Sequence, residues 1–224
     1  MQSKTGQRTR RLVTLALFAA LAYVCMVLFH IKVSFLTFDA KDAFLTVAGM
    51  CFGPAAAGCL SLMVALLEFL TVSDTGVYGL LMNFVASAAF SVPAAWIYRR
   101  AKTMKGAIGG LLCGVFSMTL VMMLMNLLIT PYFMKCELEV VLQLIPTLLL
   151  PFNLIKAVLN AALVLVLYKP MTIGLRQVHL MEGSLTPYRF GKRSAIVLAV
   201  GFSLIVICVV LLLVVMNGHF RFGS

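Results

Sequence analysis

The sequence predicts an all-α integral membrane protein, built as a bundle of six helices with one additional transmembrane helix near the C-terminus. Hydrophobic residues make up 62% of the 224 residues and charged residues only 11%, with a mean hydropathy of +1.07. Long apolar segments recur to the end of the chain, and basic residues cluster at the ends of these segments. A soluble domain of this length cannot bury that much apolar surface, whereas a bilayer can receive it.

The segments expected to form membrane helices are, in chain order, 12–29, 42–52, 54–72, 77–98, 107–129, 148–168 and 195–216. The first is expected to be a retained helix rather than a signal peptide, because no obvious small-residue cleavage site follows it. The second is well below the roughly 20 residues that cross a bilayer upright, and it ends at Gly53-Pro54. Such a short helix is tolerated only where protein or a cavity shields its ends.

The positive-inside rule favours a cytoplasmic N-terminus, because this orientation places most of the 18 basic residues on the inner side. Omitting the short second segment would move Arg99 and Arg100 to the wrong side. The predicted organisation is a basic cytoplasmic N-terminus at 1–11, a six-helix substrate-binding membrane domain at 12–170, a cytoplasmic linker at 171–194, the additional transmembrane helix at 195–216, and a tail at 217–224.

Composition and motifs exclude several functions. The net charge of +11 does not indicate nucleic-acid binding, since the basic residues follow the membrane topology. All cysteines except Cys136 lie inside hydrophobic segments and no CxxC spacing occurs, so neither a zinc site nor a disulfide framework is expected. The motifs HExxH, GxSxG and GxxxxGKS are missing from the sequence, which therefore indicates neither an enzyme nor an ATP-hydrolysing motor.

The run Pro151-Phe152-Asn153-Leu154-Ile155-Lys156 places an amide and an ammonium one helical turn apart in an apolar segment. A charged side chain in a membrane helix costs roughly 2.5–3.5 kcal/mol on insertion scales, so a bound polar ligand is a leading candidate to offset it. In the predicted topology Asn126, Asn83 and the loop 35–42 lie on the same outer side, at similar depth. Two amides and an ammonium in an apolar cavity suit a small, flat molecule with polar edges.

Each of these residues also has a purely structural interpretation. An asparagine such as Asn83 can join two membrane helices, at about 0.6 kcal/mol on average. Lys156 can extend its ammonium toward the interface, or pair with Glu68 or Asp39. The aromatic residues of this side can be ordinary interfacial anchors or can wall a flat ring; they include Phe38, Tyr132 and Phe152.

Several motifs give the chain a resemblance to a known family. They are Phe38-Asp39-Ala40-Lys41-Asp42 followed by Phe52-Gly53-Pro54, Ser73-Asp74 followed by Asn83-Phe84, Asn126 followed by Pro131-Tyr132, and the run 151–156. Over about residues 10–170 the chain resembles the substrate-binding subunits (S-components) of energy-coupling factor (ECF) vitamin transporters, and most of all the riboflavin-specific subfamily. The Phe-Gly-Pro motif is shared widely among S-components and says little about the substrate.

The resemblance implies a six-helix S-component fold with a riboflavin pocket on the extracellular side and no intrinsic cofactor. It implies that Asn126, Asn153 and Lys156 hydrogen-bond the vitamin, and that the first loop, with Leu36, Phe38 and Asp39, closes over it. It also implies a prokaryotic cell membrane, one transmembrane coupling subunit and two cytoplasmic ATPases. Small residues on the first helix dock the coupling subunit in this family, and Ala16 and Ala20 have the matching AxxxA spacing.

Two departures from the family pattern keep alternatives open. Riboflavin members usually stop after the sixth helix, whereas this chain continues with 195–216, and Lys41 stands where a small polar residue is expected. The nearest alternative is an S-component for another vitamin, such as pantothenate, folate or thiamine. Another is a stand-alone secondary transporter, for which Glu68 is the one midspan carboxylate candidate; a membrane enzyme is the remote third.

Overall fold

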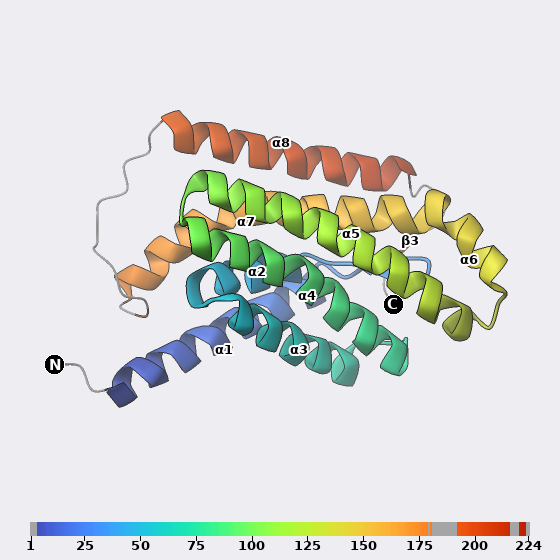
Figure 1. Cartoon of the computed structure of the whole chain (residues 1–224), viewed down its shortest axis with the longest axis horizontal. Helices are drawn as coiled ribbons and strands as arrows, with labels where there is room; N and C mark the ends of the chain where they lie inside the picture. The colour runs from blue at the N-terminus through green and yellow to red at the C-terminus, as the bar shows by residue number, and fades with distance from the viewer. Residues whose placement is uncertain (1–3, 179, 181–191, 216–219, 223–224) are drawn as a thin grey trace.

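The computed structural model describes residues 4–178, 180, 192–215 and 220–222. These residues form a helical bundle with a small sheet at one end (Figure 1). In chain order the elements are α1 (Lys4–Leu28), β1 (Ile31–Val33), β2 (Leu36–Phe38), α2 (Lys41–Phe52), α3 (Pro54–Thr71), α4 (Gly76–Ala101), α5 (Met104–Met134), α6 (Leu138–Leu144), the π-helical turn η1 (Ile145–Leu149), α7 (Leu150–Gln177), α8 (Lys192–Val215) and β3 (Phe220–Phe222).

The helices have the length and composition of membrane spans, so the all-α membrane fold class is confirmed. Within the described residues, five helical stretches are long and apolar enough to cross a bilayer: Gly6–Leu28, Pro54–Thr71, Gly76–Ala101, Met104–Met134 and Leu138–Gln177. A shorter apolar stretch, Ala195–Leu211, belongs to α8. Many of their large apolar side chains face outward, as the lipid-facing surface of a bundle requires.

The 12-residue helix α2 lies inside the bundle rather than at its edge. It packs against α1, α3, α4 and α7, and most of its residues are buried. This placement supplies the shielding that so short a helix needs. At the turn into α3, Gly53 adopts a φ of +105°, which favours glycine, and Pro54 begins the next helix.

Several helices extend beyond the hydrophobic segments that the sequence indicates. Helix α1 begins at Lys4 rather than near residue 12, and α5 continues through Pro131 to Met134. The expected linker at 171–194 is helical at both ends, because α7 runs to Gln177 and α8 begins at Lys192; residues 179 and 181–191 lie outside the described residues. Hydropathy marks only the apolar part of a helix, while lysine, arginine and glutamine also favour helix.

Helices α4 and α5 approach each other closely because α5 carries glycines at their contact. A Cβ at Gly110 would lie 2.6 Å from the backbone oxygen of Ala94, and one at Gly114 would lie 2.7 Å from that of Phe90. Small residues one turn apart allow this approach in membrane bundles. The close contact fixes α4 against α5, and these two helices line the cavity described below.

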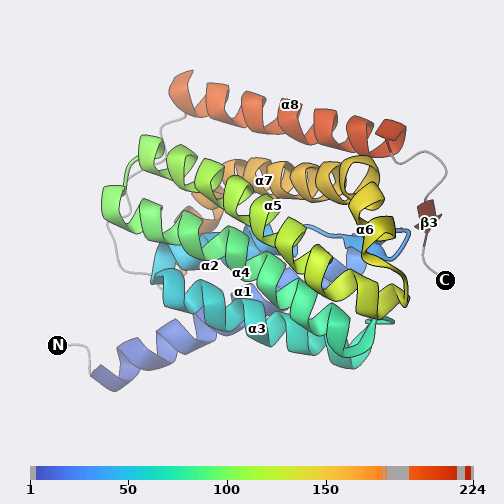
Figure 2. The same ribbon diagram turned by 45° about the vertical axis from the view of Figure 1, so that its right-hand side comes forward.

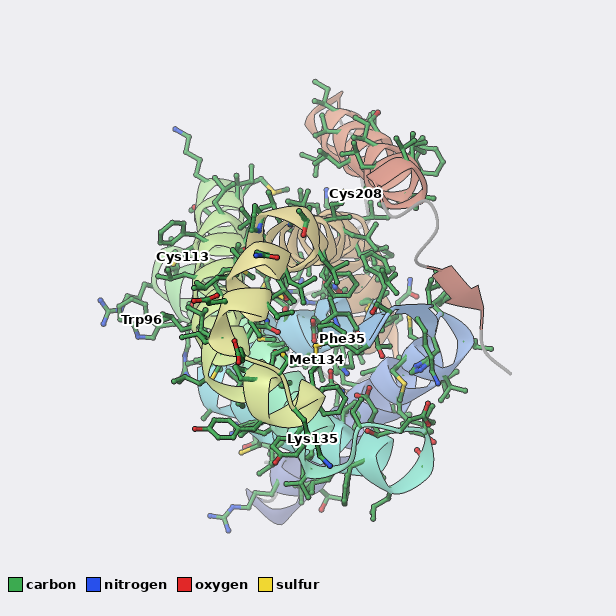
Figure 3. All side chains as sticks on the ribbon, turned by 90° about the vertical axis from the view of Figure 1, so that its right-hand side faces the viewer. Phe35, Trp96, Cys113, Met134, Lys135 and Cys208 are labelled. Atoms are coloured by element: carbon green, nitrogen blue, oxygen red, sulfur yellow. The ribbon has the colours of Figure 1, made fainter. Side chains whose placement is uncertain are left out.

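The β1–β2 hairpin, the C-terminal end of α5 and the start of α7 lie at one end of the bundle, here named the hairpin end. Figure 3 looks at this end and labels Phe35 of the hairpin turn and Met134 and Lys135 at the end of α5; the Phe35 ring lies 6.2 Å, between centroids, from that of Phe133. The opposite end holds the last turn of α4, with Arg99 and Arg100, and the first turn of α5.

Candidate functional site

A cavity of about 80 Å³ lies at the hairpin end, between α4, α5, α7 and the hairpin. Its walls are mostly apolar or aromatic, with Phe35, Tyr78, Phe133 and Phe152 among them. Polar side chains enter it from several of these elements and are Thr37, Thr75, Asn83, Thr130, Asn153 and Lys156. An apolar cavity with a few convergent polar groups is the usual form of a small-molecule site.

Lys156 joins the cavity to the loop that covers it. Its side chain is almost fully buried, and Nζ donates to Asp39 Oδ2 at 2.9 Å and to the backbone oxygen of Thr37 at 3.1 Å. The ammonium therefore has a carboxylate partner, which offsets much of the cost of burying it. A lysine carries three donors, so one N–H remains after these two bonds.

A second buried pair extends this cluster toward α3 and α4. Lys41 pairs with Glu68, and its Nζ lies 3.5 Å from Asp39 Oδ2. Glu68 Oε1 accepts a hydrogen bond of 2.8 Å from Asn83 Nδ2. A continuous polar network therefore runs from Lys156 on α7 to Asn83 on α4, and it explains why Lys41 does not reach toward solvent.

Each asparagine that lines the cavity donates one of its two amide hydrogens to a partner outside the cavity. Asn153 Nδ2 donates to the backbone oxygen of Leu149 at 2.8 Å, and Asn83 Nδ2 donates to the Glu68 carboxylate. These partners can only accept, so they fix the orientation of each amide. The side-chain oxygen of Asn83 and of Asn153 is therefore available to accept from a ligand, and each amide keeps one further hydrogen.

Asn126 is fully buried and is hydrogen-bonded to Thr130, which lines the cavity, but does not line the cavity itself. Its Nδ2 donates to the backbone oxygen of Met122 at 2.7 Å, and its Oδ1 accepts from Thr130 Oγ1 at 3.0 Å. Because the one hydroxyl hydrogen of Thr130 is used in this bond, Thr130 also presents an acceptor. The cavity thus combines oxygen acceptors from α4, α5 and α7 with the remaining donor of Lys156.

The structure brings most of the predicted site residues together in two layers. Leu36, Asn83, Phe152, Asn153 and Lys156 line the cavity. Phe38, Asp39 and Asn126 stand behind them: the Phe38 ring packs edge-on against Phe152 with centroids 6.1 Å apart, and Asp39 holds Lys156.

Tyr132 does not lie at the cavity, contrary to expectation. Its side chain is 74% exposed, whereas Phe133 lines the cavity. The reason is that α5 continues as a helix through Pro131, so that Tyr132 points about 200° away from Thr130 around the helix axis. Phe133 lies three positions after Thr130 and therefore faces the same way.

Sequence reasoning missed much of the apolar wall, including Tyr78, Met82, Met118, Met122 and Phe133. One signal was available. Met118, Met122, Asn126 and Thr130 are all buried and repeat every four residues, which places them on a single face of α5.

Two other polar residues of this end stabilise α2. Asn160 Oδ1 accepts from the backbone N–H of Ala43 at 3.0 Å, and Ser87 donates to Asp42. The first bond satisfies one of the unpaired N–H groups at the start of α2. Asn160 and Ser87 are therefore structural in this protein.

The mouth of the cavity is polar. A neighbouring cavity of about 230 Å³ shares Thr37 and Asn83 with the first and is also lined by His30, Lys32 and Asp74. Lys32 of β1 pairs with Asp74 before α4, and this hydrogen bond and charge lower the pKa of the Asp74 carboxyl. Burial lowers the pKa of His30, which favours its neutral form.

A larger cavity of about 500 Å³ lies near the opposite end, between α5, α7 and α8. Its lining is almost entirely apolar, with Tyr168, Lys169 and Gln177 as its polar members. Tyr168 is hydrogen-bonded to Tyr98. We name this space the inner cavity.

Ala16 and Ala20 lie on the exposed surface of α1, four residues apart. Helix α1 and helix α8 are on opposite sides of the bundle in both views (Figures 1 and 2). The added helix therefore leaves the α1 surface uncovered.

Comparisons with known proteins agree with this architecture. The family model "ECF transporter, substrate-specific component" matches residues 10–168. The chain is 29% identical over 181 residues to "Riboflavin transporter RibU" of Staphylococcus aureus (strain TCH60), covering 77% of this chain and 95% of that protein. It is 26% identical over 188 residues to "Riboflavin transporter FmnP" of Bacillus subtilis (strain 168), covering 77% and 99%.

A solved structure, described as "Structure and mechanism of the S component of a bacterial ECF transporter", matches with a TM-score of 0.64 at 28% identity. The match covers 75% of this chain and 99% of that one. These findings describe a multi-pass membrane protein of a transporter family rather than of an enzyme family. Since the family model spans well over half of the sequence, the chain belongs to the substrate-specific components of ECF transporters.

Proposed function

We propose that this protein captures riboflavin from outside the cell and presents it to an ATP-driven coupling module for uptake. The observation that carries the proposal is the cavity at the hairpin end, which is lined by Asn83, Asn153 and Lys156 among aromatic walls. The two relatives named as riboflavin transporters support the choice of vitamin.

The chemistry of riboflavin suits this set of groups. Its flat isoalloxazine ring can lie among Phe35, Phe133 and Phe152, which stack well on aromatic ligands. The polar edge of the ring carries one N–H between two carbonyl oxygens, and the ribityl chain carries hydroxyls. An asparagine oxygen accepts the N–H, while Lys156 donates to a carbonyl oxygen.

Binding requires the hairpin to move. Cavities that hold vitamin-sized ligands are usually about 300–1,000 Å³, whereas the cavity at the hairpin end measures about 80 Å³. Its cover is the hairpin with the loop to α2, tied down by the bonds from Lys156 to Thr37 and Asp39. We infer that these bonds loosen for entry and re-form over the bound vitamin.

The proposed assembly follows from the family. The N-terminus is cytoplasmic and the hairpin end faces outside, in the cell membrane of a prokaryote. Ala16 and Ala20 on the exposed face of α1 contact a transmembrane coupling subunit, as small residues permit close helix contact. Two cytoplasmic ATPases of that module supply the energy, since the sequence carries no GxxxxGKS motif.

The alternatives make different demands. An S-component for pantothenate, folate or thiamine would keep the fold and the coupling module but bind another vitamin. A secondary transporter would need an ion-binding carboxylate, and Glu68 is already paired with Lys41 and Asn83 in a buried site. Using Glu68 for a proton cycle would require breaking that pair in every cycle, at a cost of several kcal/mol.

Titration of the purified protein with riboflavin, followed by flavin fluorescence, tests the proposal. We expect saturable quenching that excess pantothenate, folate or thiamine does not reverse. Unquenched riboflavin, together with binding of one of the other vitamins, would assign the site to that vitamin. Riboflavin uptake that persists in cells without the ATPases would instead indicate a secondary transporter.

A further inference from the structure

The C-terminal quarter of the chain lies beyond the residues that the family model matches, which end at 168. After the end of α7 at Gln177, its described elements are helix α8 and strand β3 (Lys192–Val215 and Phe220–Phe222), together named the C-terminal strap. The strap meets the rest of the molecule at three places, on α7, at the hairpin core and along strand β1. Each contact bears on how the hairpin is held.

Helix α8 packs on α7 through one narrow face. A Cβ at Gly201 would lie 2.8 Å from Val166 Cγ2 and 3.4 Å from the backbone oxygen of Ala162, so the two helices approach closely at this glycine. Around α8, Gly201 and Cys208 are buried while the residues that follow each of them are exposed. These two residues are seven apart, hence on one face, which fixes the rotation of α8 about its axis.

At the hairpin end the same face of α8 joins the apolar cluster that also contains hairpin residues. Cys208 is 3% exposed and belongs to a buried cluster with Val33 of β1, Phe38 of β2 and Phe152 of α7. Ile205, one turn earlier, packs against this cluster. The label of Cys208 in Figure 3 marks where α8 passes over this end of the bundle. The hairpin therefore shares its apolar core with the additional helix.

Strand β3 then continues the hairpin as a third strand. It pairs antiparallel with β1, with Ile31 opposite Phe222, Lys32 opposite Arg221 and Val33 opposite Phe220, and the strand order is β2-β1-β3. Figure 3 shows β3 on the same side of the hairpin as α8. Pairing satisfies backbone groups of β1 that an edge strand leaves open.

The hairpin is thus held from both edges. On the β2 side, Lys156 bonds the backbone oxygen of Thr37; on the β1 side, β3 adds backbone pairing, and Cys208 of α8 belongs to the buried cluster that also contains Val33 of β1. Entry of a ligand much larger than about 80 Å³ requires displacing this hairpin. Any group that pairs with the hairpin only in its closed position must raise the barrier to opening.

We propose that the C-terminal strap is a built-in clamp that positions the hairpin over the cavity and slows both entry and release of the ligand. The inference rests on the proposed function only for the identity of the ligand. The strap contacts the closed hairpin whether or not a ligand is bound. It therefore lowers the rate of ligand entry and the rate of ligand release together, and it changes the affinity much less.

The test compares the full chain with a variant that stops after Val215, which removes β3 and keeps α8. Stopped-flow riboflavin fluorescence should show association and dissociation both faster by about fivefold or more, with the equilibrium affinity within about twofold. The matched control is Arg221→Ala, which keeps the backbone of β3 and should retain the rates of the full chain. A merely structural role would weaken affinity without accelerating association.

A second variant guards against misfolding of the truncated chain. Ile31→Cys combined with Phe222→Cys places two thiols opposite each other across β1 and β3. Oxidation of this pair should slow both rates, and reduction should restore them; the single variant Phe222→Cys should not respond. Rates unchanged by truncation and by the crosslink would overturn the clamp.

Hydrogen exchange separates a failure of the clamp from a failure of the proposed function. Without any ligand, the amides of residues 31–38 should exchange faster in the truncated chain than in the full chain. If they do and riboflavin fails to bind, the clamp stands and the vitamin is wrong. If riboflavin binds and exchange is the same in both chains, the clamp is wrong and the proposed function stands.

Discussion

Of the inner cavity and the cavity at the hairpin end, the larger one carries fewer polar side chains. The inner cavity measures about 500 Å³ but is lined almost entirely by apolar side chains. The cavity at the hairpin end measures about 80 Å³, yet Asn83, Thr130, Asn153 and Lys156 converge on it. An apolar space in a membrane bundle can accept any hydrocarbon, whereas directed acceptors and a paired ammonium select a ligand.

The difference also appears in the energetics of the two ends. The hairpin end buries Asp39, Lys41, Glu68 and Lys156, whereas the inner cavity has no such cluster among the described residues. Replacing a buried ion pair with well-packed apolar residues is often neutral or stabilising. Retaining this network therefore points to a role in holding the hairpin and orienting the site. The substitutions below test this difference between the hairpin end and the inner cavity.

Lys156→Met is expected to have the largest effect. It removes the one ammonium that lines the cavity and leaves the buried Asp39 with a weaker partner, Lys41 at 3.5 Å. Breaking a buried pair typically costs about 3–5 kcal/mol of folding stability, and a hydrogen bond from a charged donor contributes about 1.5–3 kcal/mol, so riboflavin affinity should fall up to about a hundredfold in a fluorescence titration. Lys169→Met at the inner cavity is the matched control and should bind as the unmodified protein does.

Asn153→Ala should weaken riboflavin binding about tenfold, because it removes one acceptor from the cavity. The change also removes the hydrogen bond from Asn153 Nδ2 to the backbone oxygen of Leu149. Thr119→Ala is a suitable control, since its hydroxyl bonds only the backbone of Val115 on its own helix. Equal affinities for the two variants, measured by the same titration, would show that Asn153 does not contact the ligand.

Glu68→Gln tests the network rather than a direct ligand contact. It removes the nearer carboxylate of the buried Lys41, leaving Asp39 at 3.5 Å, and Asn83 loses a charged acceptor, so thermal stability should fall together with a roughly threefold to fivefold loss of affinity. The double variant Lys41→Met with Glu68→Leu should recover much of the melting temperature, because no unpaired charge remains. No recovery would mean that the pair does not act as a unit.

Gly174→Ala should have the smallest effect on binding. A Cβ at this position meets nothing within 4 Å, and the residue lines the inner cavity. In α7 the change should stabilise the helix by about 0.5–1 kcal/mol and leave riboflavin affinity within about twofold. A tenfold change in a binding titration would mean that the inner cavity takes part in ligand recognition.

The sequence predicted the membrane fold and much of the site because both depend on strong local signals. Placing an ammonium and an amide in an apolar membrane segment costs free energy, so these two residues are conspicuous in the sequence. Asn153 and Lys156 do line the cavity. The short segment at 42–52 was also readable, since the positive-inside rule required it, and it corresponds to α2 at Lys41–Phe52.

The rest depended on contacts between distant segments. The pairing of Lys41 with Glu68 and of Lys156 with Asp39 joins residues 27 and 117 positions apart. The position of Tyr132 depends on the course of α5 beyond the apolar segment 107–129, because the helix continues through Pro131 to Met134 and turns Tyr132 outward. The pairing of β3 with β1 had no sequence signal, because three-residue strands carry no usable periodicity.

The most direct test of the central claim is an experimental structure of the protein determined with riboflavin. The account predicts the flavin at the hairpin end, with polar ring atoms within hydrogen-bonding distance of Asn153 and Lys156 and the hairpin displaced outward or closed over a larger cavity. Riboflavin in the inner cavity, or at the hairpin end without contact to either residue, would contradict it.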